Sequence, residues 1–279
     1  MDSIDFKSKG RIVIKVGTHS LTHADTGFID YIKIERLVME ICNLRNMGKE
    51  VVLVSSGAIA TGRQTLELLD DSPGVSIKQA LASIGQARLM SLYEKFFSQF
   101  NQIPAQVLIT RQAVIGTKTF ENALNTFNEL FRLNAVPVVN ANDTVSTFEI
   151  KHGDNDTLSA IVADLIGADL LIILTDTEGL YDKDPKKDRL ARLIPVVDEI
   201  TDSHIDSVSA SAGTDMGVGG MKTKLIAGKI ATKRGIDMVI ASGMDMSIIS
   251  RIFSGNFVGT SFLSNPDINF NISEFIGKA

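Results

Sequence analysis

Hydrophobic residues along the chain gather in short, nearly continuous runs that are separated by longer segments with a helical repeat. An apolar run without regular alternation is typical of a strand covered on both faces of a sheet. We therefore predict buried strands at Arg11–Val16, Glu50–Ser56, Ala105–Thr110, Ala135–Asn140, Leu170–Thr175 and Asp237–Ser242.

The segments between these runs carry apolar residues at the spacing of one helix face. Ile34, Leu37, Val38, Ile41 and Leu44 follow this spacing, as do the apolar residues from 158 to 165. Further helices are expected over Ala58–Leu69 and from about Thr223. Alternating strands and helices predict an α/β fold, a three-layer αβα sandwich around a central, mainly parallel open sheet.

Composition narrows the class of protein. The chain has 279 residues, and its formal net charge of -5 gives no general attraction for nucleic acid. No apolar run approaches the roughly 18–20 residues that cross a bilayer, and the first ten residues lack the apolar core of a secretory signal. The single cysteine, Cys42, is expected to be a buried, inert thiol. We expect a cytoplasmic protein with neither a membrane nor a nucleic-acid partner.

Polar residues recur where the predicted strands end. Gly17-Thr18, Ser55–Gly57, Asn140–Asp143 and Thr175-Asp176 all occupy such positions. In open α/β sheets, ligands bind outside the carboxyl ends of the strands. The recurrence therefore predicts one ligand site along this edge of the sheet.

Two of these strand ends suit an anion. Lys15 interrupts an apolar strand, and a buried lysine is costly unless an anion or a carboxylate compensates it. A lysine that reaches solvent at the strand end is the alternative, but Gly17 would let a phosphate approach the backbone closely. Backbone N–H groups of the Ser55–Ala58 turn could also bind an anion, although an ordinary capped strand–helix turn fits equally well.

The segment from Asn140 to Asp156 concentrates amides and carboxylates, with Gly153-Asp154-Asn155-Asp156 at its end. One of these side chains could simply cap the following helix, but three in succession exceed what capping needs. The set suits a small ligand with both an ammonium and a carboxylate, or a site that holds lysines. Gly217–Lys224 is expected to be a flexible loop that brings two lysines to a helix start. GxxxxGK[ST], GxSxG and an early GxGxxG are absent from the sequence.

Six segments together resemble the glutamate 5-kinase family of the amino acid kinase superfamily, in unbroken order over about Arg11–Leu263. They are IVIKVGTHSLT, VVLVSSGAIATGR, IKQALASIGQARLM, VPVVNANDTVSTFEIKHGDNDTLSA, LTDTEGLYDKDP and GVGGMKTKLIAGKIATKRGID. The resemblance implies ATP-dependent phosphorylation of the L-glutamate γ-carboxylate to γ-glutamyl phosphate, the first step of proline biosynthesis. ATP would be the co-substrate with Mg²⁺, which would be bridged mainly by ATP rather than by the protein.

The resemblance also implies roles for single residues. Phosphoryl transfer would depend on Lys15, Lys224 and Asp156. Glutamate would bind Ser56, Gly57, Asn140, Asp143, Asp154 and Asn155. ATP would contact Lys15, Thr175, Asp176, Val218, Gly219, Gly220, Met221, Lys222, Thr223 and Lys224.

The expected organisation is a single amino acid kinase domain over residues 1–279, with a glutamate-binding lobe at about 11–165 and an ATP-binding lobe at about 166–263. A C-terminal PUA domain, which many relatives carry, is not expected. Gln112–Gly116 departs from the acidic residues that many relatives have in a region tied to proline feedback, and Val218 replaces a frequent threonine. We expect a dimer or tetramer, with possible coupling to glutamate-5-semialdehyde dehydrogenase.

Three alternatives remain from the residues. Another carboxylate or carbamate kinase of the superfamily, such as an acetylglutamate kinase, would not need a site for a free α-ammonium. A non-catalytic sensor of ATP or amino acids would tolerate the loss of Lys15 or Lys224. A Rossmann dehydrogenase is disfavoured, because no GxGxxG follows the first strand.

Overall fold

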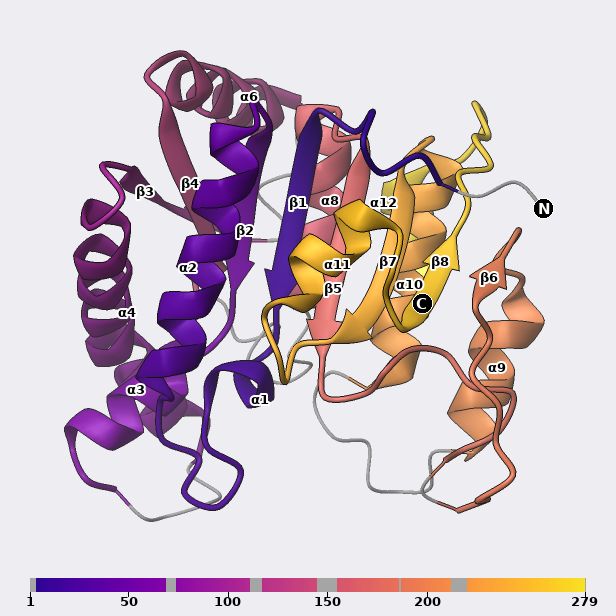
Figure 1. The fold of residues 1–279 in the computed structure, drawn as a ribbon, viewed down its shortest axis with the longest axis horizontal. Helices are drawn as coiled ribbons and strands as arrows, with labels where there is room; N and C mark the ends of the chain where they lie inside the picture. Colours follow the sequence, from indigo (N-terminus) through magenta and orange to yellow (C-terminus); the bar gives the residue numbers. More distant parts are fainter. Residues whose placement is uncertain are drawn as a thin grey trace.

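The computed structural model describes residues 4–68, 74–110, 117–144, 155–185, 187–211 and 220–278. These residues form an eight-stranded sheet with the strand order β3-β4-β2-β1-β5-β7-β8-β6 (Figure 1). The strands are β1 (Arg11–Val16), β2 (Glu50–Ser55), β3 (Ile103–Ile109), β4 (Ala135–Ala141), β5 (Leu170–Thr175), β6 (Val196–Val197), β7 (Asp237–Ser242) and β8 (Gly259–Phe262).

Helices connect the strands. They are α1 (Thr18–Leu21), α2 (Tyr31–Asn46), α3 (Ala58–Thr65), α4 (Val75–Ser98), α6 (Thr117–Arg132), α8 (Asn155–Ile166), α9 (Asp202–Ser211), α10 (Met221–Lys233), α11 (Ile248–Ser254) and α12 (Ile272–Lys278). No helix in the described ranges combines the length and the apolar character that crossing a membrane requires.

The sheet is parallel from β3 through β7, and β1 lies inside it between β2 and β5. Ile12 of β1 is opposite Val51 of β2 on one side and Leu170 of β5 on the other. β8 runs antiparallel to β7, and β6 pairs parallel with β8. The predicted strands are therefore confirmed, with shifts at some ends, and β6 and β8 are additions. β6 has only two residues and GTSF of β8 has little apolar character, so neither gives a sequence signal.

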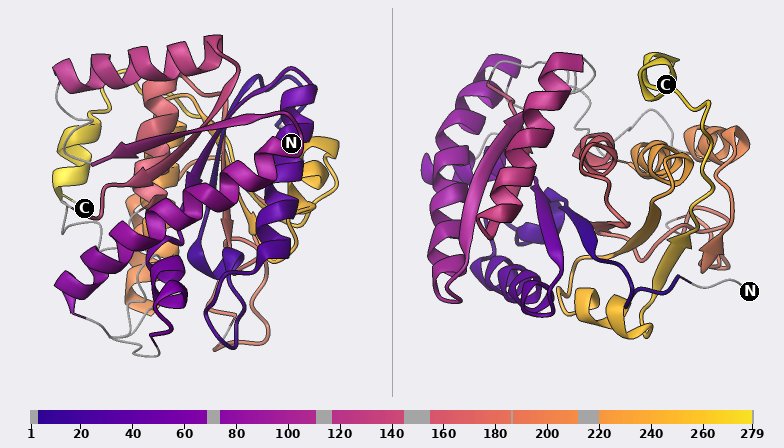
Figure 2. Two further views of the ribbon diagram at one scale, coloured as in Figure 1. Left: turned by 90° about the vertical axis from the view of Figure 1, so that its left-hand side faces the viewer. Right: turned by 90° about the horizontal axis from the view of Figure 1, so that it is seen from above.

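Helices cover both faces of the sheet, as the αβα prediction requires. Figure 2 shows α2 and α11 on one face and α8 and α10 on the other. Each layer has its own buried cluster of apolar side chains, and strand residues alternate between the two clusters. Ile12, Ile14 and Val16 belong to the cluster with α2, α4 and α11, whereas Val13 belongs to the cluster with α6, α8 and α10. Lys15 shares the face of Val13 because side chains in a strand alternate with period two.

Several local predictions change. α3 ends at Thr65, before the predicted end at Leu69, which lies outside the described residues. α10 begins at Met221, so Met221, Lys222, Thr223 and Lys224 form a helical turn and not the end of a loop. Cys42 is buried as predicted, and burial raises the pKa of its thiol to about 11.

Candidate active site

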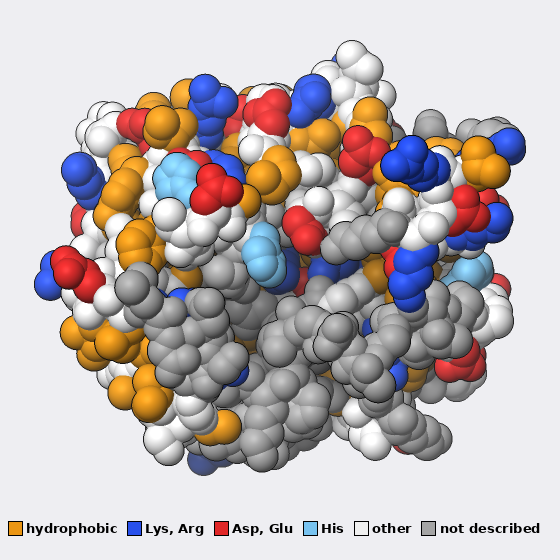
Figure 3. Space-filling model, turned by 90° about the horizontal axis from the view of Figure 1, so that it is seen from below, with side chains coloured by type: hydrophobic (Ala, Val, Ile, Leu, Met, Phe, Trp, Pro, Cys, Tyr) orange, Lys and Arg blue, Asp and Glu red, His pale blue; other side chains and the backbone are white. Residues whose placement is uncertain are grey.

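The predicted site residues that the structure describes lie along the edge at which the parallel strands end, on the lower side of Figure 1. Lys15 is near the end of β1, Ser56 and Gly57 follow β2, Asn140 ends β4, and Thr175 ends β5. Figure 3 looks at this side of the molecule and shows lysine or arginine atoms near the middle, beside histidine and acidic side chains. The strand ends thus gather into one region, as the sequence predicted.

Three charged side chains are in contact at this edge of the sheet, on the face covered by α8 and α10. Nζ of Lys15 lies 2.6 Å from Oδ1 of Asp156, and Nζ of Lys224 lies 3.2 Å from Oδ2 of the same carboxylate. The hydroxyl of Thr223 donates to Oδ2 at 2.7 Å. Asp156 is fully buried, and the two lysines are only 5% and 4% exposed. The set therefore carries a net charge of about +1 in a place with little water.

The fold explains how residues so far apart in sequence meet. Lys15 faces the layer of α8 and α10 because of its place in β1. Asp156 is the second residue of α8, and Lys224 is in the first turn of α10, on its buried side. α8 packs against β1, and α10 packs against α8. Two helix N-termini therefore deliver a carboxylate and an ammonium to the lysine of the central strand.

The charges set the protonation of the carboxylate. Burial alone would raise the pKa of Asp156, but the ammonium groups of Lys15 and Lys224, together with hydrogen bonds from Lys15 and Thr223, lower it to about 2. Burial lowers the pKa of Lys224, and Asp156 opposes this effect. Asp156 is thus ionised at neutral pH and can orient both ammonium groups.

A second group of polar side chains lies at the ends of β2 and β4. Nδ2 of Asn155 donates to Oγ of Ser56 and to Oδ1 of Asn140, each at 3.0 Å. Nδ2 of Asn140 donates in turn to Oε1 of Gln86 at 2.9 Å. Asn140 and Gln86 are buried, whereas Ser56 and Asn155 are half-buried. Because Asn155 and Asp156 are consecutive, the two groups are neighbours.

Backbone geometry after β2 fixes the position of Ser56. Gly57 has φ of 104°, in the left-handed region that strongly favours glycine, and it is the N-cap residue of α3. Ser55 turns to the opposite face, where its hydroxyl lies 2.7 Å from the hydroxyl of buried Tyr93 on α4. Ser56 is thereby left on the side of Asn155.

The other predicted residues divide between described and undescribed parts. Asp143 is half-buried just beyond β4, and Asp176 is exposed next to Thr175, whose hydroxyl donates to it at 3.1 Å. Burial would raise the pKa of Asp176, but hydrogen bonds, first from Thr175, and the electrostatic influence of Lys224 lower it. Gly220 is the N-cap residue of α10. Asp154, Val218 and Gly219 lie outside the described residues, as does Gln112–Gly116.

Sequence reasoning missed Gln86. It lies on α4 within the buried stripe that includes Ala82, Leu89 and Tyr93. A long polar side chain in an apolar helical stripe is the signal that could have identified it, because buried polar groups are hydrogen-bonded. Its partner on β4 could not be identified without the fold.

Carboxylates that could bind Mg²⁺ directly are sparse in the described part of the chain. Within the part of the chain that the structure describes, no three His, Cys, Asp or Glu side chains cluster closely enough to hold a metal ion. Mg²⁺ usually keeps several waters and binds substrate phosphates with one or two carboxylates, so it does not require such a cluster. Binding of Mg²⁺ mainly through the phosphates of ATP stays a prediction.

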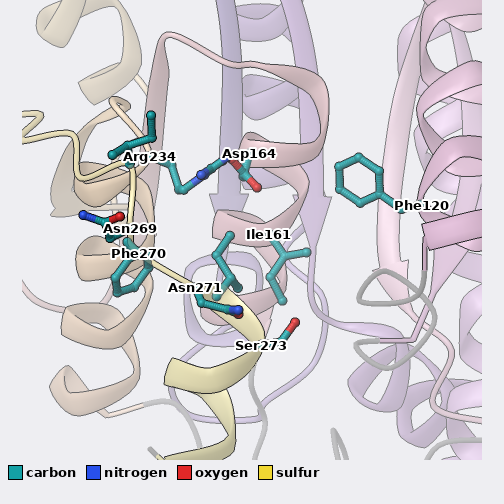
Figure 4. Close-up of a pocket in the computed structure, with 10 residues that line it drawn as sticks. Phe120, Ile161, Asp164, Arg234, Asn269, Phe270, Asn271 and Ser273 are labelled. Carbon is teal, nitrogen blue, oxygen red and sulfur yellow. The ribbon is translucent and has the colours of Figure 1, made fainter.

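A separate cavity of about 390 Å³ lies between α6, α8, α10 and the segment leading into α12. In Figure 4 the side chains of Asp164 and Arg234 point toward one another on one side of it, and Phe120 approaches from α6. None of the predicted site residues lines this cavity. It is therefore a different region from the polar edge of the sheet.

Comparison with known proteins supports a family assignment. Residues 10–242 match the model of the amino acid kinase family. The UMP kinases of Ureaplasma parvum and Bacillus anthracis share the fold, with TM-scores of 0.59 and 0.60 and 16% identity; the alignments cover 91% and 92% of this chain and 99% and 97% of theirs.

Closer relatives come from sequence comparison. The glutamate 5-kinase of Caldanaerobacter subterraneus subsp. tengcongensis is 47% identical over 92% of this chain and 69% of its own length. That of Carboxydothermus hydrogenoformans is 49% identical over 92% and 68%, and that of Clostridium perfringens is 44% identical over 92% and 97%. This chain therefore belongs to the amino acid kinase family and, within it, to the glutamate 5-kinases.

Proposed function

We propose that the chain transfers the γ-phosphoryl group of ATP to the γ-carboxylate of L-glutamate, the reaction that opens proline biosynthesis. The observation that carries this proposal is the pair of lysines held by the single buried carboxylate of Asp156. Phosphoryl transfer needs positioning and charge stabilisation more than covalent chemistry by the protein. Two oriented ammonium groups at a strand edge supply both.

Lys15 and Lys224 offset the repulsion between two anions. A glutamate carboxylate has to approach a polyanionic phosphate chain in line, and the lysines neutralise charge that is shared by the attacking and leaving oxygens. Their buried position strengthens this effect, because a charge interacts more strongly where water is scarce. Asp156 fixes the positions of both ammonium groups, so little reorganisation of these charges is needed during the reaction.

The acceptor needs no general base, since a glutamate side chain with a pKa near 4.3 is ionised at neutral pH. Selection of glutamate falls to the polar group around Ser56, Asn140 and Asn155, with Gly57, Asp143 and Asp154 as further contacts. A hydroxyl and amide oxygens at this place suit the α-carboxylate and α-ammonium of a free amino acid. This chemistry distinguishes glutamate from an acceptor whose amine is acylated.

The nucleotide lies on the other half of the sheet in this proposal. Thr175, Asp176 and the start of α10 contact ATP, with Val218 and Gly219 included from the family resemblance. The glutamate-binding lobe at about 11–165 then contains β1 to β4, and the ATP-binding lobe at about 166–263 contains β5 to β8. The order of strands in the sheet supports this division, because β1 and β5 are adjacent at the boundary.

Mg²⁺ on the phosphate oxygens would offset part of the nucleotide charge. A cytoplasmic location stays a prediction from composition, and a dimer or tetramer and coupling to a dehydrogenase that consumes the acyl phosphate stay predictions from the family resemblance.

The test is a panel of acceptors with ATP and Mg²⁺. Acyl phosphate is trapped as a hydroxamate with glutamate, N-acetylglutamate, aspartate or carbamate as acceptor, each with and without proline. We expect turnover with glutamate well above that with the other acceptors. Turnover with N-acetylglutamate and none with glutamate would contradict the proposal, and ATP binding without any turnover would indicate a sensor.

A further inference from the structure

Gln86 has a position that no assigned role explains. The residue is 9% exposed, and its side chain lies where α4 passes the end of β4. The backbone at this point is fixed by a close crossing of α3 and α4, because a Cβ atom on Gly85 would lie 1.7 Å from the carbonyl oxygen of Ala58. Gln86 is therefore held in one place relative to the turn after β2.

The hydrogen bond from Gln86 completes the set around the amide of Asn140. Nδ2 of Asn140 donates to Oε1 of Gln86 at 2.9 Å, and Oδ1 accepts from the backbone N–H of Ala141 at 2.9 Å and from Nδ2 of Asn155 at 3.0 Å. A rotation of this amide by half a turn would place its NH₂ group against the two donors. Asn140 therefore has one favourable orientation, and the acceptor on Gln86 is part of what selects it.

The orientation of the Asn140 amide in turn determines the orientation of the Asn155 amide, which contacts Ser56. The Asn155 amide donates both of its hydrogens, one to Oδ1 of Asn140 and one to Oγ of Ser56, and this fixes the amide with its acceptor Oδ1 on the opposite side. Oγ of Ser56 accepts from Asn155, so the hydroxyl proton of Ser56 can be donated elsewhere. An acceptor on Asn155 and a donor on Ser56 are thereby set side by side.

We propose that Gln86 is a positioning residue for the amino-acid substrate, and that it acts through Asn140 and Asn155 to set the polarity of the binding site. Asn155 would accept from the α-ammonium group, and Ser56 would donate to the α-carboxylate. This inference rests on the proposed function, because it assumes that the acceptor is a free amino acid. It adds a residue on α4 that has no direct contact with the reacting atoms.

The experiment compares Gln86→Met, which keeps the length of the side chain and removes the acceptor, with Gln86→Glu, which retains an oxygen acceptor. Gln99→Met is the matched control, because Gln99 is exposed at the end of the same helix. KM for glutamate, KM for ATP and kcat are measured for each variant, together with the preference for glutamate over glutarate, which lacks the α-ammonium group. Circular dichroism and thermal unfolding report whether each variant is folded.

We expect Gln86→Met to raise KM for glutamate about tenfold, since one buried hydrogen bond in the relay is lost, while kcat and KM for ATP change by less than about twofold. The preference for glutamate over glutarate should fall by a similar factor, whereas Gln86→Glu and Gln99→Met should stay near the wild type. Gln86→Met in an Asn155→Ala background should add little, because Asn155 transmits the effect.

Other outcomes overturn the inference. They are an unchanged KM for glutamate in Gln86→Met, an equal rise in the KM for ATP, or full additivity with Asn155→Ala. If Gln86→Met does not fold, Gln86→Glu provides the test: loss of its preference for glutamate over glutarate rejects the inference. Failure of the proposed function can be distinguished from failure of this inference, because the wild type would then prefer another acceptor in the panel. The variants are in that case measured with the preferred acceptor. An unchanged KM for it again rejects the role of Gln86.

Discussion

At the scale of single residues, the charge of the site depends on Asp156. One fully buried carboxylate contacts two ammonium groups, so the three side chains form a compact unit with an excess positive charge. A unit-charge contact at 4 Å has an interaction energy of about 4 kcal/mol at an effective dielectric of 20. Loss of any member therefore changes the electrostatic environment of an incoming phosphate.

Lys224→Met tests the part of this unit on α10. We expect kcat to fall about 100- to 1,000-fold, because one preorganised cation beside the transferring phosphoryl group is removed, and KM for glutamate to change little. Lys229→Met is the control on the same helix, since Lys229 pairs with Asp202 away from the site. Steady-state kinetics measure the effect. A kcat that falls by less than about tenfold would contradict this role, because loss of a single ordinary hydrogen bond has an effect of roughly that size.

Acid sensitivity gives a second prediction at this scale. The folded-state pKa of Asp156 is about 2, below the ordinary value of 3.8, so its contribution to stability is present at higher pH and is lost as the pH falls toward 2. The shift corresponds to about 2 kcal/mol. Urea unfolding of wild type and Asp156→Asn should give a stability difference that is constant above about pH 4 and shrinks below it. A difference that does not depend on pH would contradict the depressed pKa.

At the scale of elements, the crossing of α3 and α4 joins the acceptor site to the helical layer. Glycines on both helices allow their backbones to touch: a Cβ atom on Gly62 would lie 2.1 Å from the carbonyl oxygen of Leu81, and one on Gly85 would lie 1.7 Å from that of Ala58. Ser56 precedes α3, and Gln86 follows Gly85 directly. The same contact therefore places both ends of the hydrogen-bond relay.

Gly85→Ala should separate these helices. We expect a loss of about 1–3 kcal/mol of unfolding free energy from overpacking, together with a higher KM for glutamate. Gly277→Ala in α12 is the control, because a Cβ atom there meets nothing within 4 Å and alanine favours a helix. Denaturant unfolding and glutamate kinetics test both effects. Wild-type stability in Gly85→Ala would mean that the helices do not touch as closely as described.

At the scale of the whole molecule, the two proposed lobes share one sheet. β1 pairs with β2 over six residues and with β5 over five residues, so it belongs to the hydrogen-bonded surface of both halves. α8, which carries Asn155 and Asp156, packs under β1 as well as β5. The lobes are therefore not expected to fold independently.

A fragment of residues 1–166 tests this expectation. It would retain β1 to β4 and α8 but would expose β1 as a long apolar edge, which favours aggregation. We expect poor solubility or the absence of a cooperative unfolding transition, and recovery of structure when a fragment of residues 167–279 is refolded with it. Circular dichroism and size-exclusion chromatography give the answer. A soluble, cooperatively unfolding 1–166 monomer would show that the lobes are separable.

Much of the fold and part of the site could be predicted because their signals are local. Continuous apolar runs identified the parallel strands, and Lys15 was identified because it interrupts one of them. β6 and β8 were missed because two residues and a polar tetrapeptide carry no such signal. The helix predicted from about Thr223 begins two residues earlier, at Met221, because the glycines before it hide the exact boundary in the sequence.

The sequence by itself determined the layers of the fold, the edge at which polar residues gather, and the family resemblance. These properties follow from periodicity, from strand ends and from residue types in order, which need no knowledge of distant contacts. The family resemblance implied that Asp156 orients the two lysines, but only the tertiary structure decided that its buried carboxylate lies 2.6 Å from Lys15 and 3.2 Å from Lys224, and that Gln86 hydrogen-bonds Asn140. The physical reason is that these contacts join segments about 50 to 140 residues apart, and packing of α4, α8 and α10 against the sheet is what brings them within hydrogen-bond distance.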